Sequence, residues 1–416
     1  MKLEFGYGKG VQSVDVDADR IVAILKPNDV EHGDGGEAEV ERALSNPIGS
    51  GRVEEIVKPG ERIAIITSDI TRPMPTYAVM PALLKRLYGA GVRPEDITLV
   101  FALGSHRGQS DEERAKLAGQ FAASQIRMED SDPDDCVHMG NTSSGTPIDI
   151  TRRVAEADRR ICLGNIEYHY FAGYSAGIKA IMPGCSTRAA IQSNHSMMVS
   201  DDACAGKLEG NPVREDLEEA ERLCHVDFIL NVVLDEHKKI VKAVAGDVVK
   251  AHREGCAFLD KLYSTPIPHR ADIVIVSQGG APKDLNLYQT QKALDNAKHA
   301  VKDGGIIILA GACQEGLGER VFEQWLTSSE TSKSMIERIR KDFQLGGHKA
   351  AAIAMVLEHA DVYLVSEMEP EFVKSIFMQP FASIDEAFAA ATKKLGSDSS
   401  VIAMPYGGST LPQIGR

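Results

Sequence analysis

The segment from Glu167 to Met198, EYHYFAGYSAGIKAIMPGCSTRAAIQSNHSMM, concentrates reactive side chains among small and apolar neighbours. It holds two histidines and one lysine, His169, Lys179 and His195. A histidine can offer a neutral nitrogen to a late transition metal or carry a proton near neutral pH. A lysine among apolar residues has a lowered pKa and can serve as a covalent anchor. The competing interpretation is a Gly/Ala-rich helix-packing segment with incidental histidines.

The stretch Asp69–Arg72 follows an apolar run and leads into Pro73, a residue favoured near the first turn of a helix. Backbone amides at the start of a helix attract phosphate or carboxylate groups. The guanidinium of Arg72 could grip a carboxylate through two hydrogen bonds. Taken alone, the same residues also fit a capping aspartate followed by a surface arginine.

Two further motifs carry polar groups next to expected elements. His106 stands in GSHR directly after a second apolar run, where a lone histidine is often only a solvated loop residue. Tyr288, Gln289 and Lys292 stand in YQTQK at the expected start of a helix, a pattern that also fits ordinary helix surface.

Taken together, these blocks resemble the nickel-dependent lactate racemase family, whose members share a pattern close to H-x-F-A-G-x-S-G-G-R-K-x-I-x-P-G followed by N-H-S. The matching residues are His169, Phe171, Ala172, Gly173, Ser175, Gly177, Lys179, Ile181, Pro183, Gly184, Asn194, His195 and Ser196. The family's D-x-x-R-P, G-T-H-R and Y-Q-x-x-K blocks have counterparts in the same order. Two residues depart from the pattern, Ala176 for a glycine and Ile178 for an arginine.

The resemblance implies a nickel pincer nucleotide, the mononucleotide Ni(II)-pyridinium-3,5-bisthiocarboxylate, as the cofactor. It implies that Lys179 anchors this group through a thioamide and that His195 is the protein's nickel ligand. The nucleotide contacts that the resemblance assigns are Asp69, Ile70, Thr71, Arg72 and Ile181. Enzymes that make the cofactor are then expected as maturation partners.

The resemblance further implies a racemase or epimerase that inverts the C2 centre of a 2-hydroxy acid, such as lactate, by reversible hydride transfer to that cofactor. His106 and His169 are implied as the two general acid/base residues, and two are useful because each enantiomer presents its hydroxyl proton to a different base. The implied substrate contacts are Arg72, Tyr288, Gln289 and Lys292.

Composition limits the class of protein. The net charge of −14 over 416 residues argues against nucleic acid or an anionic membrane as a partner. No apolar run approaches the roughly 18 residues of a membrane-spanning helix. Seven cysteines without paired spacing indicate reduced thiols and a cytoplasmic location.

Apolar runs that alternate with helical patterns predict an α/β fold with two domains, mainly parallel sheets and a ligand cleft. The expected strands are 62–67, 97–102, 160–164, 272–277, 305–310, 361–365 and 400–404, with a hairpin of 228–233 and 240–245. Helices are expected at 76–89 and around 248–263. The domains are placed at 1–265 and 270–397, separated by the two-proline segment STPIPHR, with 398–416 as a candidate to return to the first domain.

Two other classes of function remain open at this stage. The three histidines His106, His169 and His195 could instead ligate zinc in a hydrolase. A two-domain protein could also bind a hydroxy acid as a sensor without turnover.

Overall fold

The computed structural model describes residues 1–30, 33, 35–235 and 237–415. The chain forms two compact units, one of residues 30–260 and one in which residues 1–29 join 261–416. Each unit contains a six-stranded sheet, which confirms the predicted α/β class. Within the described residues, every helix is too short or too polar to cross a membrane.

The sheet of the 30–260 unit has the strand order β13-β12-β9-β4-β5-β6, and all neighbours are parallel except the β12–β13 hairpin. Its strands are β4 Ile63–Ser68, β5 Ile97–Ala102, β6 Arg127–Asp130, β9 Arg159–Asn165, β12 Phe228–Leu234 and β13 Ile240–Gly246. Its helices are α1 Gly36–Ser45, α2 Val53–Ile56, α3 Thr76–Gly89, α4 Asp111–Ala123, α5 Arg152–Ala155, α6 Arg188–Ser196, α7 Pro212–Leu223 and α8 Lys250–Tyr263, the last of which runs past the unit boundary. Short strand pairs β7 Cys136–Asn141 with β8 Pro147–Thr151, and β10 Tyr168–His169 with β11 Gly173–Tyr174, complete it.

The predicted strands of this unit form because their apolar runs are buried on both faces. In β4, every residue but the last is buried. Helix α3 presents Val79, Leu83 and Leu87, spaced at four residues, to the core that also contains Leu99 and Phe101 of β5. Fully burying such a side chain contributes about 1.5–3 kcal/mol, so this layer stabilises the sheet that carries the carboxyl-end loops.

The other unit contains a fully parallel sheet in the order β18-β17-β16-β15-β19-β3. Its strands are β3 Ile21–Ile24, β15 Ala271–Ser277, β16 Val301–Ala310, β17 Ala360–Val365, β18 Gln379–Phe381 and β19 Val401–Met404. Its helices are α9 Leu287–Ala297, α10 Arg320–Ser328, α11 Ser332–Lys341, α12 Gly347–Leu357, α13 Pro370–Ser375 and α14 Ile384–Leu395. The pairs β1 Lys2–Tyr7 with β2 Gly10–Asp15, and β14 Ser264–Ile267 with β20 Leu411–Ile414, flank it.

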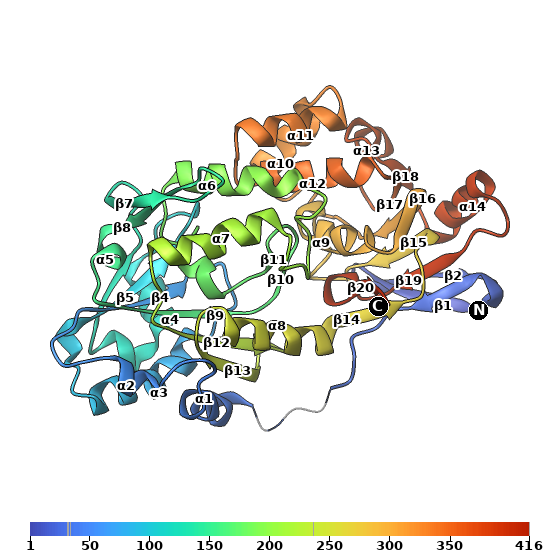
Figure 1. Cartoon of the computed structure of the whole chain (residues 1–416). Coiled ribbons are helices and arrows are strands. Elements are labelled where there is room, and N and C mark those ends of the chain that lie inside the picture. The colour runs from blue at the N-terminus through green and yellow to red at the C-terminus, as the bar shows by residue number, and fades with distance from the viewer. Residues whose placement is uncertain (31–32, 34, 236, 416) are drawn as a thin grey trace. The chain divides into compact units, whose positions relative to one another are not determined.

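The structure corrects the predicted division at both ends of the chain. Residues 1–29 do not belong with the N-terminal domain, because β3 pairs with β19 at the edge of the second sheet. Residues 398–416 do not return to the first domain, since β19 lies between β15 and β3. Figure 1 shows the blue N-terminal strands beside the red C-terminal segment in this unit. Pairing over such sequence distances leaves no local signal.

Two smaller predictions also change. The segment read as a linker, STPIPHR, begins with strand β14, which pairs in parallel with β20. Pro73 does not open a helix, because α3 begins at Thr76 after Pro75. The amides that follow Asp69–Arg72 are therefore those of a loop and not of a first helical turn.

Candidate active site

Three of the predicted motifs lie at one edge of the first sheet. Strands β9, β4 and β5 are parallel neighbours, so the loops that follow them leave from the same edge. These loops contain Asp69, His106 and the hairpin with His169. A further polar loop, QGGAPKD at residues 278–284, follows β15 in the other unit and belongs to a separate sheet.

Asp69 and His106 form a close pair between two of these loops. The Asp69 carboxylate Oδ2 lies 2.5 Å from His106 Nδ1, and Thr71 Oγ1 donates to Asp69 Oδ1 at 2.7 Å. Burial alone would raise the pKa of Asp69, but the hydrogen bond and charge of His106 outweigh it, so this pKa is lowered. A carboxylate can only accept here, which makes Nδ1 the protonated nitrogen of the neutral ring and gives Nε2 the lone pair. His106 is thus held in the tautomer that a general base needs.

The remaining residues of the predicted nucleotide-binding loop differ in exposure. The backbone N–H of Ile70 donates to Gln109 Oε1 at 2.8 Å, which fixes the loop between Asp69 and the exposed Arg72. Ile181, a predicted nucleotide contact from the next motif, is fully buried.

The ring of Phe171 brings together the three reactive residues of the Glu167–Met198 segment. Its centroid lies 4.5 Å from the ring of His169 and 4.8 Å from the ring of His195, both edge-on. The Lys179 side-chain nitrogen Nζ lies 5.8 Å from the same centroid. The predicted acid/base residue, covalent anchor and metal ligand therefore surround one aromatic side chain.

His169 is half-buried on the short strand β10, which β11 pairs antiparallel. Burial lowers the pKa of His169 well below its usual value, and the charges of Lys179 and His195 lower it further. The ring is therefore neutral near pH 7. The backbone N–H of Ala172 donates to its Nδ1 at 3.3 Å, so the neutral ring has its proton on Nε2, the opposite tautomer to that of His106.

Lys179 lies on the 3₁₀ turn Gly177–Ala180, which follows the hairpin. Burial lowers the pKa of Lys179 well below its usual value, and the charges of Arg214 and Arg72 act in the same direction. An uncharged amine is the nucleophilic form of lysine. This is the chemistry that a covalent anchor requires.

The two departures from the family pattern lie beside this lysine. Ala176 has φ 61° and ψ −161°, a backbone conformation that glycine alone adopts without strain. Its methyl group is accommodated because Gly164 opposite it has no side chain. Ile178, which replaces an arginine, is buried at 3% exposure.

His195 is buried on α6, and its orientation is set by a chain of hydrogen bonds. The Asn194 amide nitrogen donates to Val213 O at 3.1 Å and to Asp216 Oδ2 at 2.8 Å. This fixes Asn194 Oδ1 as the atom that faces His195 Nδ1, at 2.9 Å. His195 Nδ1 must then donate, so Nε2 carries the lone pair that a metal ligand needs.

Helix α7 and its N-cap residue Asn211 supply supporting residues that the sequence analysis missed. Asn211, Arg214 and Asp216 are all at least 98% buried, and they contact the hairpin backbone or Asn194. The signal available in the sequence was polar residues within a helix that also buries Val213 and Leu217. Which neighbours those polar groups meet depends on tertiary packing.

His252, which the sequence analysis left as structural, also supports the motif. Its Nε2 lies 2.7 Å from the carbonyl oxygen of Ser175, and burial lowers its pKa to about 3. A side chain on Gly177 would collide with its ring, which explains the glycine there.

Tyr288, Gln289 and Lys292 stand in the first turns of α9, in the other unit. Asn286 Oδ1 caps this helix by accepting from the Gln289 N–H at 3.0 Å. Lys349, a residue that the sequence analysis did not single out, donates to Tyr288 O at 2.6 Å and lies 3.9 Å from the centroid of its ring. Substrate contact by these residues requires the two units to meet, and it stays a prediction.

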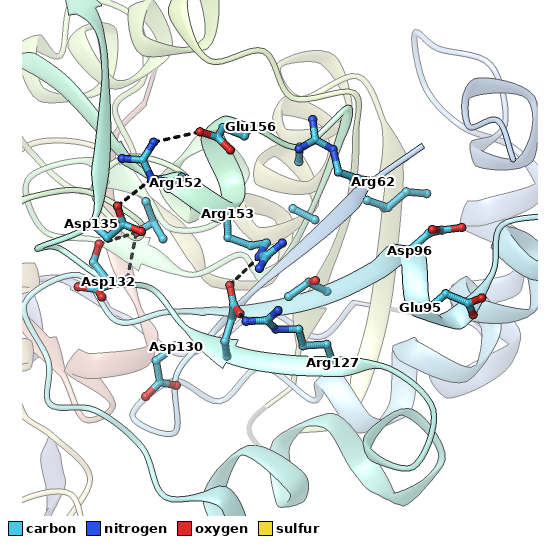
Figure 2. A pocket seen from close by; sticks show the side chains of 16 residues that line it. Arg62, Glu95, Asp96, Arg127, Asp130, Asp132, Asp135, Arg152, Arg153 and Glu156 are labelled. Atoms are coloured by element: carbon cyan, nitrogen blue, oxygen red, sulfur yellow. Dashed lines mark hydrogen bonds and ion pairs between the residues drawn. The ribbon is translucent and has the colours of Figure 1, made fainter. Parts of the chain in front are cut away.

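A polar recess elsewhere on the first unit is distinct from these groups. Much of its lining comes from the amino ends of β4, β5 and β6, the edge opposite Asp69 and His106. Figure 2 shows arginines of this recess held by carboxylates, among them Arg152 with Asp135 and Glu156. Its cationic groups are already neutralised by these ion pairs.

Comparison with known proteins agrees with this arrangement. The sequence model of the lactate racemase N-terminal domain matches residues 7–206, and that of the lactate racemase C-terminal domain matches residues 267–411. A lactate racemase of Thermoanaerobacterium thermosaccharolyticum is 34% identical over 98% of each chain. The chain belongs to the lactate racemase family. It is therefore an isomerase, a racemase.

Further relatives support the same assignment. The lactate racemase of Lactiplantibacillus plantarum is 35% identical over 88% of this chain and 89% of its own. The structure of the lactate racemase apoprotein from T. thermosaccharolyticum superposes with a TM-score of 0.87 at 33% identity and covers 99% of this chain and 100% of that one. A Thermotoga maritima protein with a TM-score of 0.64 and 18% identity, over 93% and 100% of the two chains, shares the fold.

Two of the sequence predictions are settled by these findings. The resemblance to the racemase family is confirmed, and so is the enzyme class.

The zinc alternative needed three converging ligands, and the described part of the chain has no group of three or more His, Cys, Asp or Glu side chains suited to hold a metal.

Proposed function

We propose that this racemase inverts the C2 centre of a 2-hydroxy acid, lactate or a related 2-hydroxy carboxylate, with a nickel pincer nucleotide attached to Lys179. The observation that carries the proposal is the gathering of His169, Lys179 and His195 around the ring of Phe171. When bound, the nucleotide supplies a hydride acceptor that does not leave the site.

The residues present fit this cofactor. Lys179 is held uncharged by burial and by neighbouring cations, as attack on a thiocarboxyl group requires. His195 has its lone pair on Nε2, because Asn194 Oδ1 accepts a hydrogen bond from Nδ1–H. A single protein ligand is enough for a metal whose other donors come from the nucleotide itself. The backbone N–H groups of Ile70, Thr71 and Arg72 are already bonded to Gln109 and Asp69, so this loop offers the nucleotide the exposed side chains of Thr71 and Arg72.

The chain's own groups then divide the proton work. Arg72 holds the substrate carboxylate through two parallel hydrogen bonds. His106, with its Nε2 lone pair fixed by Asp69, accepts the hydroxyl proton of one enantiomer. His169 serves the opposite enantiomer: as the imidazolium it donates the Nε2 proton to the keto oxygen and becomes neutral, and as the neutral ring it accepts the hydroxyl proton on Nε2, which requires the remaining proton to lie on Nδ1 and the Ala172 contact to be lost.

The C-terminal unit contributes the remaining substrate contacts in this proposal. Tyr288, Gln289 and Lys292 at the start of α9 hold polar groups of the substrate when the cleft closes. Exclusion of water from a closed site strengthens each of these polar contacts. Enzymes that assemble the nucleotide are required as partners during maturation.

The test uses protein produced together with those enzymes and a substrate deuterated at Cα. Lactate, malate, 2-hydroxyglutarate, phenyllactate and gluconate are each followed for loss of optical purity and for retention of the label. A sequestered hydride predicts inversion with the deuterium largely retained, whereas a base acting on Cα–H would exchange it with water. If loaded protein inverts none of these acids, or exchanges the label fully, the proposal fails.

Two sets of variants assign the roles. His106→Ala and His169→Ala should retain nickel and lose roughly 10²–10⁴-fold in rate. Arg72→Lys should be severely impaired, since lysine cannot form the planar pair of donors. Saturable hydroxy-acid binding by fully loaded protein without any turnover would instead favour the sensor interpretation.

A further inference from the structure

The strand pair that carries His169 is too short to be stable on its own. Strands β10 and β11 contain two residues each, and they pair Tyr168 with Tyr174 and His169 with Gly173. Even a longer isolated hairpin is only marginally stable in water. The position of the His169 ring must therefore be fixed by contacts from outside the hairpin.

One carboxylate holds both strands of this hairpin at the residue pair next to His169. Asp260 accepts from the Tyr168 hydroxyl at 2.7 Å, and from the Tyr174 hydroxyl at 2.8 Å on one oxygen and 2.9 Å on the other. The two tyrosine rings are 5.4 Å apart and cross at 46°. Hydrogen bonds to an ionised acceptor are stronger than those between neutral groups. We call the contact of Asp260 with the Tyr168 and Tyr174 hydroxyl groups the Asp260 clamp, because it holds the two strands together through their side chains.

Asp260 lies on α8, a helix anchored independently of the hairpin. Arg253 on α8 bridges to Glu218 on α7 at 2.8 and 3.1 Å, and Leu259 is buried in the interior. The clamp thus ties a weak two-residue ladder to a 14-residue helix. Burial raises the pKa of Asp260 while the tyrosines act against this, as expected for a carboxyl held away from water.

The backbone on the other side of the hairpin is held by α7. Arg214 donates to the carbonyl oxygens of Ala172 and Tyr174, and Asn211 donates to Phe171 O at 2.9 Å. These contacts fix the turn between the strands. At the start of β10, Ser175 N–H donates to Glu167 O at 2.9 Å and Glu167 N–H donates to Ser175 Oγ at 2.8 Å, and the Asp260 clamp adds the side-chain anchor that ties Tyr168 to α8.

We propose that Asp260 is a positioning residue for His169: through Tyr168 and Tyr174 it fixes the hairpin that aims the imidazole at the substrate. The inference rests on the proposed acid/base role of His169. A displacement of about 1 Å in a reacting group can cost on the order of 10² in rate, so loss of the clamp should act on catalysis more than on binding. Asp260 itself touches no reacting atom in this proposal.

The test compares Asp260→Ala with Asp260→Asn, whose amide oxygen can still accept from both tyrosines. The matched control is Arg253→Gln, which removes a bridge of similar geometry from the same helix and has no contact with the hairpin. In cofactor-loaded protein, Asp260→Ala should lower kcat by roughly 10- to 100-fold with KM within about twofold. Asp260→Asn should recover most of this loss, and Arg253→Gln should keep the parental kcat.

A second readout needs no cofactor. Hydrogen exchange of the apoprotein should accelerate in the peptide 168–174 of Asp260→Ala and not in that of Arg253→Gln. In cofactor-loaded protein, the Lys179 adduct and the nickel content should stay unchanged in both variants. If Asp260→Ala does not fold, Tyr168→Phe, which removes one donor, replaces it and should show the same effects in smaller measure.

The outcomes separate this inference from the proposed function. Parental kcat in Asp260→Ala, unchanged exchange of 168–174, or equal losses in the Arg253→Gln control would overturn the clamp. Full activity in His169→Ala would instead overturn the acid/base role of His169, whatever the clamp variants show.

Discussion

Lys179 offers the sharpest test of the electrostatics of the site, because its reactivity can be measured without cofactor. A lysine with an ordinary pKa of about 10.4 is roughly 0.04% neutral at pH 7, and each unit of pKa depression raises that fraction about tenfold. Burial and the charges of Arg214 and Arg72 depress the pKa of Lys179 well below this value. The largest possible gain in neutral amine at pH 7 is therefore on the order of 10³.

The assay is competitive acylation of the apoprotein with trace reagent between pH 6 and 10, read by peptide mass spectrometry. Lys207 is the internal control, since its hydrogen bond with Asp202 raises its pKa. Labelling of Lys207 should rise about tenfold per pH unit across the range, whereas labelling of Lys179 should level off at a much lower pH. Partial burial slows the access of the reagent to Lys179. The pH at which labelling levels off is therefore compared, and not the absolute rate of labelling. Arg72→Gln should shift the Lys179 profile to higher pH.

The lowered pKa of Lys179 also makes the free energy of unfolding depend on pH in a defined direction. Between the folded-state pKa of Lys179 and the unfolded value near 10.4, the unfolded chain holds the proton and the native chain does not, so the free energy of unfolding rises with pH in that window. Lys179→Met should remove this part of the pH dependence. A Lys179 labelling profile that runs parallel to that of Lys207 would refute the reasoning.

Two further predictions follow from named contacts. Asp69→Asn should keep the fold but lower kcat by roughly 10- to 100-fold, because a neutral amide no longer dictates the His106 tautomer. Steady-state kinetics of cofactor-loaded protein measure this effect. An unchanged kcat would remove Asp69 from the mechanism. Ala176→Gly should raise the free energy of unfolding by about 1–3 kcal/mol, since only glycine adopts φ 61° and ψ −161° without strain; a denaturant titration with no gain, or a loss, would contradict that account.

The predicted elements were mostly right because each is encoded locally. The run 97–102 and the helix 76–89 have the predicted bounds, and the other expected strands differ by a few residues at most, apart from β16, which begins four residues early. An apolar run of strand length and a helical apolar spacing depend on neighbours along the chain. The edge of the second sheet was missed since β3 is only four residues long and pairs with β19 near the other end of the chain.

By itself, the sequence determined the family resemblance, the candidate site residues and the order in which they follow the strands. The tertiary structure alone decided that Asp69 orients His106, that Phe171 gathers His169 and Lys179, and that residues of α7 and α8 support the hairpin. Such contacts join residues tens of positions apart, and their geometry depends on how whole helices and strands pack. Local patterns carry no record of that packing, so the sequence could name candidate residues but could not predict the contacts that orient them.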